Sequence, residues 1–137
     1  MDIDYTPLEK AINQLEISLR YANSEMAQQD SGLFEQLRNS VIQCFEFTYE
    51  LSHKMLRRYI EEGAASTATL DIQSFQNLIR AGNEQNLLRS DWRKWKAYRQ
   101  ARNESSHTYD LDKAEQVYLI TPDFLLEAKY LYQELTK

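Results

Sequence analysis

Apolar residues recur at intervals of three and four along most of this chain, which is the pattern of amphipathic helices. The first stripe follows Thr6, whose hydroxyl is expected to cap a helix, with Pro7 in the first turn and Glu9 completing a capping box. Ser31 and Gly32 mark the expected end of this helix and the start of the next. The apolar positions of the first helix are Leu8, Ile12, Leu15, Leu19, Ala22 and Met26.

A second, longer stripe predicts a helix from about residue 33 to 62, which Gly63 would end. Thirty helical residues span roughly 45 Å, which is long for a small domain. Two long helices early in the chain therefore indicate a helical bundle. The side chains expected on the buried side of the second helix are Leu37, Val41, Cys44, Phe45, Thr48, Leu51, Met55, Leu56 and Tyr59.

Small and polar residues over 64–69 indicate a loop, and the pattern after it predicts a shorter helix over about 71–81 that Gly82 would end. Its inward side chains would be Phe75, Leu78 and Ile79.

A fourth helix is expected to begin near Ser90 or Asp91. A short helix over about 111–119 and a last helix opened by Thr121 and Pro122 would complete the chain. The fourth helix places Trp92, Trp95, Arg99 and Arg102 on one face. The last helix would bury Phe124, Leu125, Ala128 and Leu131 or Tyr132.

The composition supports this helical interpretation, because three glycines and two prolines in 137 residues are few for a turn-rich fold. We predict an all-α fold: an antiparallel four-helix up-and-down bundle with one or two extra short helices, in a single domain over residues 1–137.

Cys44 is the single cysteine, so an internal disulfide and a cysteine-based metal site are excluded. Without a recognisable signal peptide or membrane-length apolar run, we expect a cytoplasmic protein that contacts no membrane.

The formal net charge of −5 argues against general nucleic-acid binding, which depends on neutralising phosphates. The distribution of charge changes this picture, because residues 89–102 contain six basic residues and one acidic residue. Within this basic stretch Arg93, Lys96 and Arg99 are candidate RNA contacts. The same stretch also fits an ordinary solvated helix face.

An octapeptide over residues 102–109 places a permanent cation, an imidazole and a phenol directly after the basic stretch. Arg102 can hold a phosphate and His107 can transfer a proton near neutral pH, so the pair suits phosphodiester cleavage without a metal. On one continuous helix these two side chains would be rotated by about 140°. Ser105 and Ser106 favour a helix end or kink between them, which would let both face one cleft.

RNA carries its own nucleophile, since its 2′-hydroxyl can attack the adjacent phosphorus and give a 2′,3′-cyclic phosphate and a 5′-hydroxyl. His107 would take that proton or protonate the departing oxygen, while Arg102 stabilises the charge on the phosphate oxygens. One imidazole cannot easily be both acid and base. A symmetric dimer would bring a second octapeptide, and His53 is an unproven alternative.

Structural interpretations of the same residues stand beside these chemical ones. Trp92, Trp95 and Tyr98 fit core or interface anchors as well as base-stacking platforms. His53 fits a surface or interface position. The carboxylates of Glu46 and Glu50, four residues apart on the second helix, fit its polar edge as well as a paired acid site.

Two segments resemble the HEPN superfamily, specifically its HepT-like branch, which is encoded beside minimal nucleotidyltransferases and was formerly described as nucleotidyltransferase substrate-binding proteins. Residues 38–51, with their Phe-Glu and Glu-Leu pairs and the following Lys54, are similar to the long-helix signature of that branch. Residues 102–109 match its Arg-x4-His-x-Tyr motif. The chain departs from the pattern at residues 52–53 and 104–105, which bears on substrate preference more than on catalysis.

The resemblance implies a homodimeric bundle in which Arg102 and His107 line a cleft, acting as the metal-independent ribonuclease toxin of a toxin–antitoxin pair. It also implies an antitoxin nucleotidyltransferase that transfers AMP from ATP to Tyr109, so this chain itself would need no cofactor. Asn103 is carried over as a polar neighbour of the cleft. Glu46 and Glu50 are carried over as inward-facing residues that would orient His107 or Arg102.

Two other functions remain compatible with the sequence. A non-catalytic adaptor would present a nucleotide or substrate to the nucleotidyltransferase through the same cleft and would tolerate loss of His107. A plain helical interaction module would bury Trp92 and Trp95 against a partner, leaving the octapeptide incidental.

Overall fold

The computed structural model describes residues 3–63 and 74–137, and every regular element in these ranges is helical. The predicted all-α fold is therefore confirmed. The predicted loop over residues 64–69 and the first residues of the helix expected from residue 71 lie outside the described ranges. The elements are α1 (Thr6–Ala22), α2 (Glu25–Gln29), α3 (Ser31–Gly63), α4 (Phe75–Glu84), α5 (Trp92–Glu104), the short 3-10 helix η2 (Ser105–His107) and α6 (Leu111–Leu135).

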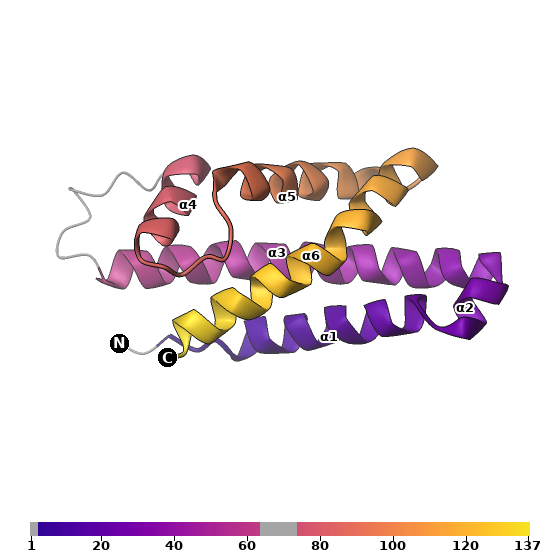
Figure 1. Ribbon diagram of the computed structural model, residues 1–137, viewed down its shortest axis with the longest axis horizontal. Helices are drawn as coiled ribbons and strands as arrows, with labels where there is room; N and C mark the ends of the chain where they lie inside the picture. The colour runs from indigo at the N-terminus through magenta and orange to yellow at the C-terminus, as the bar shows by residue number, and fades with distance from the viewer. Residues whose placement is uncertain (1–2, 64–73) are drawn as a thin grey trace.

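Four long helices form the bundle, with α3 running along its whole length (Figure 1). Helix α1 lies along one side of α3 and α5 along the other, while α6 crosses α3 diagonally (Figure 1). Both α1 and α5 run antiparallel to α3, so the up-and-down arrangement is confirmed as well. In the described part of the chain, no helix combines the length and apolar character needed to cross a membrane.

Five aromatic side chains form the centre of the bundle, and we call them the aromatic core: Phe45, Tyr49, Trp95, Tyr98 and Phe124. Each is at most 4% exposed. Phe124 contacts Phe45, Trp95 and Tyr98 edge to face, with ring centroids 4.9 to 5.9 Å apart, an arrangement that adds quadrupole attraction to apolar burial. Burial raises the pKa of Tyr49 to about 12. The core interpretation of Trp95 and Tyr98 is confirmed, and Trp95 cannot anchor a partner because it is fully enclosed.

The first helix starts and ends differently from the prediction. Thr6 is its first residue, but the Thr6 hydroxyl does not cap it; the Thr6 N–H donates to Asp4 Oδ1 at 2.9 Å instead. The helix ends at Ala22, and a separate short helix, α2, precedes Ser31. Met26 lies on α2 and is 71% exposed, so its expected place on the buried stripe is wrong, while the other five positions are buried.

Helix α3 has nearly the predicted bounds, and its buried face is wider than predicted. The predicted positions that are buried are Val41, Phe45, Thr48, Met55 and Leu56. Leu37, Cys44, Leu51 and Tyr59 are only half-buried. The buried residues that were not predicted are Ile42, Tyr49, Ser52, Ile60 and Arg38. The buried face is wider because α3 packs on three sides, where α1, α5 and α6 together cover more of the helix than one amphipathic stripe.

Gly82 does not end α4 as expected, because the helix continues to Glu84. Its role is close packing. A Cβ at position 82 would lie 2.9 Å from Leu88 Cδ1, so a larger residue there would force the Leu88 side chain to move. The predicted inward residues Phe75, Leu78 and Ile79 are all buried.

Pro122 lies inside α6, so the two helices expected over 111–119 and from Thr121 are one. A proline cannot donate to the carbonyl four residues earlier, which here belongs to Tyr118. The Thr121 hydroxyl donates to that carbonyl oxygen at 2.7 Å and so replaces the missing N–H. The Thr121-Pro122 dipeptide, which the sequence suggested as a helix start, therefore lies in the interior of a helix, where the Thr121 hydroxyl replaces the hydrogen bond that Pro122 cannot make.

Candidate active site

Helix α5 ends within the octapeptide, as predicted. Its last residue is Glu104, and the chain continues through η2 over Ser105–His107. The Ser105 hydroxyl lies 2.7 Å from the Arg102 carbonyl oxygen, so it competes for a group that would otherwise continue the helical hydrogen bonding. The helix therefore breaks between Arg102 and His107.

Arg102 is held against α3 by two carboxylates. Its Nε donates to Glu50 Oε1 at 2.8 Å, and its Nη1 donates to Glu46 Oε2 at 3.2 Å. The planar guanidinium is suited to this because its N–H groups point in fixed directions. The structure thus brings the two glutamates expected near the site to Arg102, and not to His107.

Ser105 completes this contact and was not among the predicted site residues. It is 4% exposed, and its Oγ lies 2.7 Å from Glu46 Oε2 and 3.3 Å from Arg102 Nη1. We call Arg102, Glu46, Glu50 and Ser105 the α3–η2 junction. The signal in the sequence was the Arg-x-x-Ser spacing at a helix end, where a hydroxyl can reach back by one turn.

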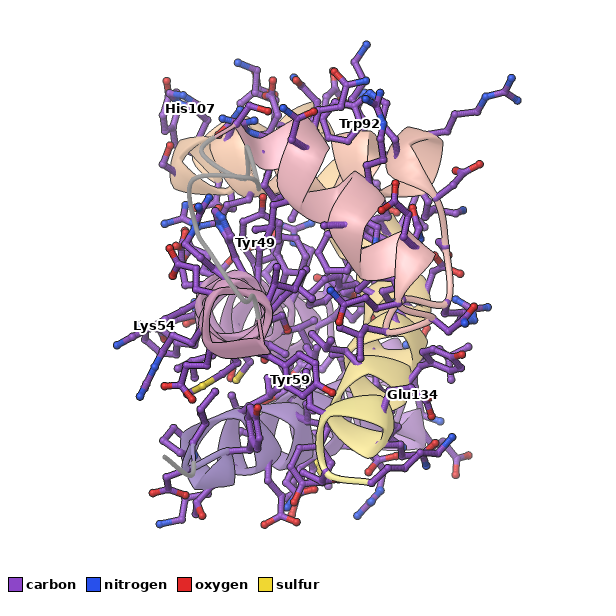
Figure 2. All side chains as sticks on the ribbon, turned by 90° about the vertical axis from the view of Figure 1, so that its left-hand side faces the viewer. Tyr49, Lys54, Tyr59, Trp92, His107 and Glu134 are labelled. Carbon is purple, nitrogen blue, oxygen red and sulfur yellow. The ribbon has the colours of Figure 1, made fainter. Side chains whose placement is uncertain are left out.

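His107 follows the junction and has a different partner. Its Nδ1 lies 3.3 Å from the Tyr109 hydroxyl, and the two rings meet edge to face at 5.8 Å. Tyr109 is 81% exposed. Figure 2 shows His107 at the periphery of the molecule, whereas Tyr49 lies in the interior between α3 and α5. Within the described residues no hydrogen bond joins Arg102 to His107, so a cleft shared by both side chains stays a prediction.

The six basic residues of the 89–102 stretch fall into separate groups. Arg89 and Lys94 lie 3.4 and 3.6 Å from the Asp123 carboxylate of α6. Although burial alone raises the pKa of Asp123, its hydrogen bond from Tyr98 and these two cations hold it below its ordinary value. The predicted RNA contacts Arg93, Lys96 and Arg99 are exposed, as is Asn103.

The sequence fits His53 to a surface or interface position, and within the single chain the residue is only partly exposed. It is half-buried, and its ring packs edge-on against Phe75 at 5.0 Å between centroids. Arg99 stacks on the same Phe75 ring at 4.8 Å. Burial lowers the pKa of His53, and Arg57 and Arg99 lower it further. This environment favours a neutral imidazole that packs against aromatic rings.

Comparisons with known proteins show the family and the fold of this chain. Residues 3–137 match the family described as nucleotidyltransferase substrate binding protein like. A Haemophilus influenzae protein named probable ribonuclease HepT is 40% identical over 107 residues, which cover 78% of this chain and 73% of that protein. A solved structure from the same organism, described as the fold of a substrate binding domain of a nucleotidyltransferase, is 34% identical with a TM-score of 0.89, over 98% of this chain and 100% of that chain. The resemblance drawn from residues 38–51 and 102–109 is confirmed, and this chain belongs to the nucleotidyltransferase substrate binding protein like family.

Proposed function

We propose that this protein is a metal-independent endoribonuclease, the toxin of a toxin–antitoxin pair that acts on cytoplasmic RNA. One observation carries the proposal: α5 ends two residues after an arginine that two carboxylates hold in place, and His107 follows in the short 3-10 helix that comes next. The 40% identity to a protein named probable ribonuclease HepT supports the same activity.

Arg102 keeps binding capacity for a phosphate despite its two carboxylate partners. Its Nε and Nη1 contact Glu50 and Glu46, whereas Nη2 makes no hydrogen bond with any described residue. The two N–H groups of Nη2 are therefore available to an oxygen of the scissile phosphate. Fixed donors of this kind stabilise charge that develops in the transition state without reorganising.

In the proposed reaction the RNA 2′-oxygen forms a bond to phosphorus while the bond from phosphorus to the 5′-oxygen breaks. The products are a 2′,3′-cyclic phosphate and a 5′-hydroxyl. His107 transfers one of the two protons involved, through its Nε2, because its Nδ1 contacts Tyr109. In a homodimer the second proton transfer falls to His107 of the second copy.

An antitoxin nucleotidyltransferase would neutralise this activity at Tyr109. The phenolic oxygen attacks the α-phosphorus of ATP, pyrophosphate leaves, and the phenolic proton passes to solvent. The 81% exposure of Tyr109 supports access by an enzyme, and its hydroxyl lies 3.3 Å from His107 Nδ1. An added AMP would place an anion and a base beside His107 and block the RNA phosphate.

The test is cleavage of labelled RNA by purified His107→Ala protein in the presence of a metal chelator. Wild type should cleave and leave 2′,3′-cyclic phosphate ends, whereas the variant should not, with its helical content and oligomeric state unchanged. Arg89→Ala is the matched control, because it removes a cation of the same stretch that contacts α6; it should cleave normally. Cleavage that persists in His107→Ala would disprove the catalytic assignment.

Coexpression with the neighbouring nucleotidyltransferase tests the modification. Wild type should gain mass in whole AMP increments, and Tyr109→Phe should gain none. An antitoxin that inhibits by stoichiometric binding, without any mass change, would replace modification by sequestration.

A second candidate function is a non-catalytic adaptor for a nucleotidyltransferase. The description of the solved relative as a substrate binding domain favours it, as does the family description. The adaptor requires no RNA cleavage by the wild-type protein and tolerates His107→Ala, so the same experiment separates the two functions.

A further inference from the structure

Arg38 is a buried arginine whose side chain has no partner within the described residues. It is 8% exposed, and its Nε is fully enclosed without a hydrogen bond. No ion pair joins it to any acidic residue in the described part of the chain. Arg102 differs in both respects, since its side chain is 31% exposed and contacts two carboxylates.

An unpaired buried cation is unfavourable, and arginine cannot avoid the cost by losing its proton. Lysine and arginine are almost never fully buried unless they are paired. The folded chain therefore supports a positive charge that lacks a counterion. Among the guanidinium nitrogens of Arg38, only Nε is enclosed without a partner. The 8% of the residue that is exposed therefore gives an anion access to the two terminal nitrogens.

The register of the helices gives the direction in which the octapeptide runs along α3. Arg102 contacts Glu50 and Ser105 contacts Glu46, so the chain moves toward lower α3 numbers as it leaves α5. The residues after Ser105 continue in the direction of Arg38, which lies two helical turns before Glu46.

Helix α6 contacts α3 on the N-terminal side of Arg38. One turn before Arg38, Phe34 packs edge to face against Tyr118 of α6, with ring centroids 5.5 Å apart. Arg38 thus lies on α3 between Phe34, which contacts α6, and Glu46, which contacts η2. A ligand seated on the octapeptide would pass close to this stretch.

We propose that Arg38 binds a phosphodiester next to the one held by Arg102. This inference rests on the proposed function and names a second subsite for it. The single positive charge of Arg102 faces the two negative charges of Glu46 and Glu50. The α3–η2 junction is therefore net negative and by itself repels a polyanion. The unneutralised charge of Arg38 offsets that repulsion and favours phosphate over a neutral ligand.

Two ligands could supply the phosphodiester that Arg38 binds: the RNA strand itself, and the AMP group on Tyr109. The first test measures binding of a short fluorescent single-stranded RNA to the full-length protein in a His107→Ala background, where the RNA stays intact. Arg38→Met keeps the volume of the side chain without its charge, and Arg38→Lys keeps the charge.

For RNA as the source, Arg38→Met should lower affinity about tenfold and reduce the salt slope by about one counterion, whereas Arg38→Lys should retain most of both. Arg80→Met removes an exposed arginine on α4 and should leave the salt slope unchanged. For the AMP group as the source, modification should raise the melting temperature of wild type but not of Arg38→Met.

The stability of unliganded Arg38→Met separates binding from a structural role. Replacing an unpaired buried charge by an apolar side chain should raise the melting temperature or leave it unchanged. A large loss of stability, a dimer that dissociates, or unchanged values in both ligand tests would overturn the proposal. Failure of wild type to cleave RNA would overturn the proposed nuclease function instead, and the binding measurements would still decide the role of Arg38.

Discussion

The aromatic core and the α3–η2 junction join the same two helices by different physics. In the core, Tyr49 of α3 and Trp95 of α5 are buried at 4% and 0% exposure, and their rings pack with Phe124. In the junction, Arg102 and Glu50 meet through a charge-assisted hydrogen bond of 2.8 Å at a partly exposed site. Apolar burial contributes most of the stability of such a bundle, whereas a partly exposed ion pair contributes little. The junction therefore sets the geometry of the site and the core holds the helices that carry it.

Removing a core ring should have the largest effect on this comparison. Phe124→Ala should lower the free energy of unfolding by about 3–5 kcal/mol, because it deletes a fully buried ring and leaves a cavity. Urea unfolding followed by circular dichroism measures this. Leu126→Ala is the matched control on the same helix, since Leu126 is 51% exposed, and it should change stability by less than about 0.5 kcal/mol. Similar losses for both variants would contradict the assignment of the core.

Changing Arg102 should instead affect activity with little loss of stability. Arg102→Lys keeps the charge but loses the fork that reaches Glu46, Glu50 and phosphate together. RNA cleavage should fall by about 10²–10³-fold, the usual effect of losing a fixed donor to developing charge. The melting temperature should change little, because the ion pairs are partly exposed. Initial rates on labelled RNA provide the measurement, and near wild-type cleavage would show that a point charge is sufficient.

Ser105 offers a sharper distinction because it touches Arg102 and Glu46 without being charged. Ser105→Ala leaves the carboxylate of Glu46 with one donor fewer, so we expect about a tenfold loss in kcat with KM for RNA nearly unchanged and a stability cost of about 1–3 kcal/mol. Ser106→Ala is the control, since Ser106 is exposed and contacts only the Asn103 carbonyl oxygen among the described residues. Equal kinetics for the two variants would remove Ser105 from the site.

The smallest expected effect is a pH dependence at the edge of the aromatic core. Burial lowers the pKa of His53 in the folded protein, so the unfolded chain takes up a proton first as pH falls. The contribution of His53 to stability is complete above the unfolded value of about 6.5 and is lost as pH falls from there through the lower folded value. Urea unfolding at pH 7.5 and 5.5 should show a smaller decrease for His53→Gln than for wild type; equal decreases would show that His53 does not titrate differently on folding.

Features that depend on neighbours in sequence were predictable, and features that depend on neighbours in space were not. The long helices and the break after Arg102 follow from apolar spacing and local serine hydrogen bonds. Pro122 was misread as a helix start because its effect depends on whether another donor reaches the Tyr118 carbonyl. Gly82 was misread as a helix end because its role depends on Leu88.

The residues of the candidate site also fall into those predictable from neighbours in sequence and those that depend on neighbours in space. The Arg-x4-His-x-Tyr spacing identified Arg102, His107 and Tyr109 directly. The sequence shows six basic residues close together, and the structure pairs Arg89 and Lys94 with Asp123 and leaves Arg93, Lys96 and Arg99 exposed. Charge partners come from other helices, so composition alone cannot say which charges remain unneutralised.

The sequence by itself determined an all-α bundle and the family of the protein, and it singled out the segment proposed to carry the chemistry, because helical periodicity and short motifs are encoded by residues a few positions apart. Only the tertiary structure decided that Glu46, Glu50 and Ser105 hold Arg102, that His53 packs against Phe75, and that Arg38 is buried without a counterion. These outcomes depend on the register between α3 and α5, and that register is set by how large aromatic side chains interlock across the bundle.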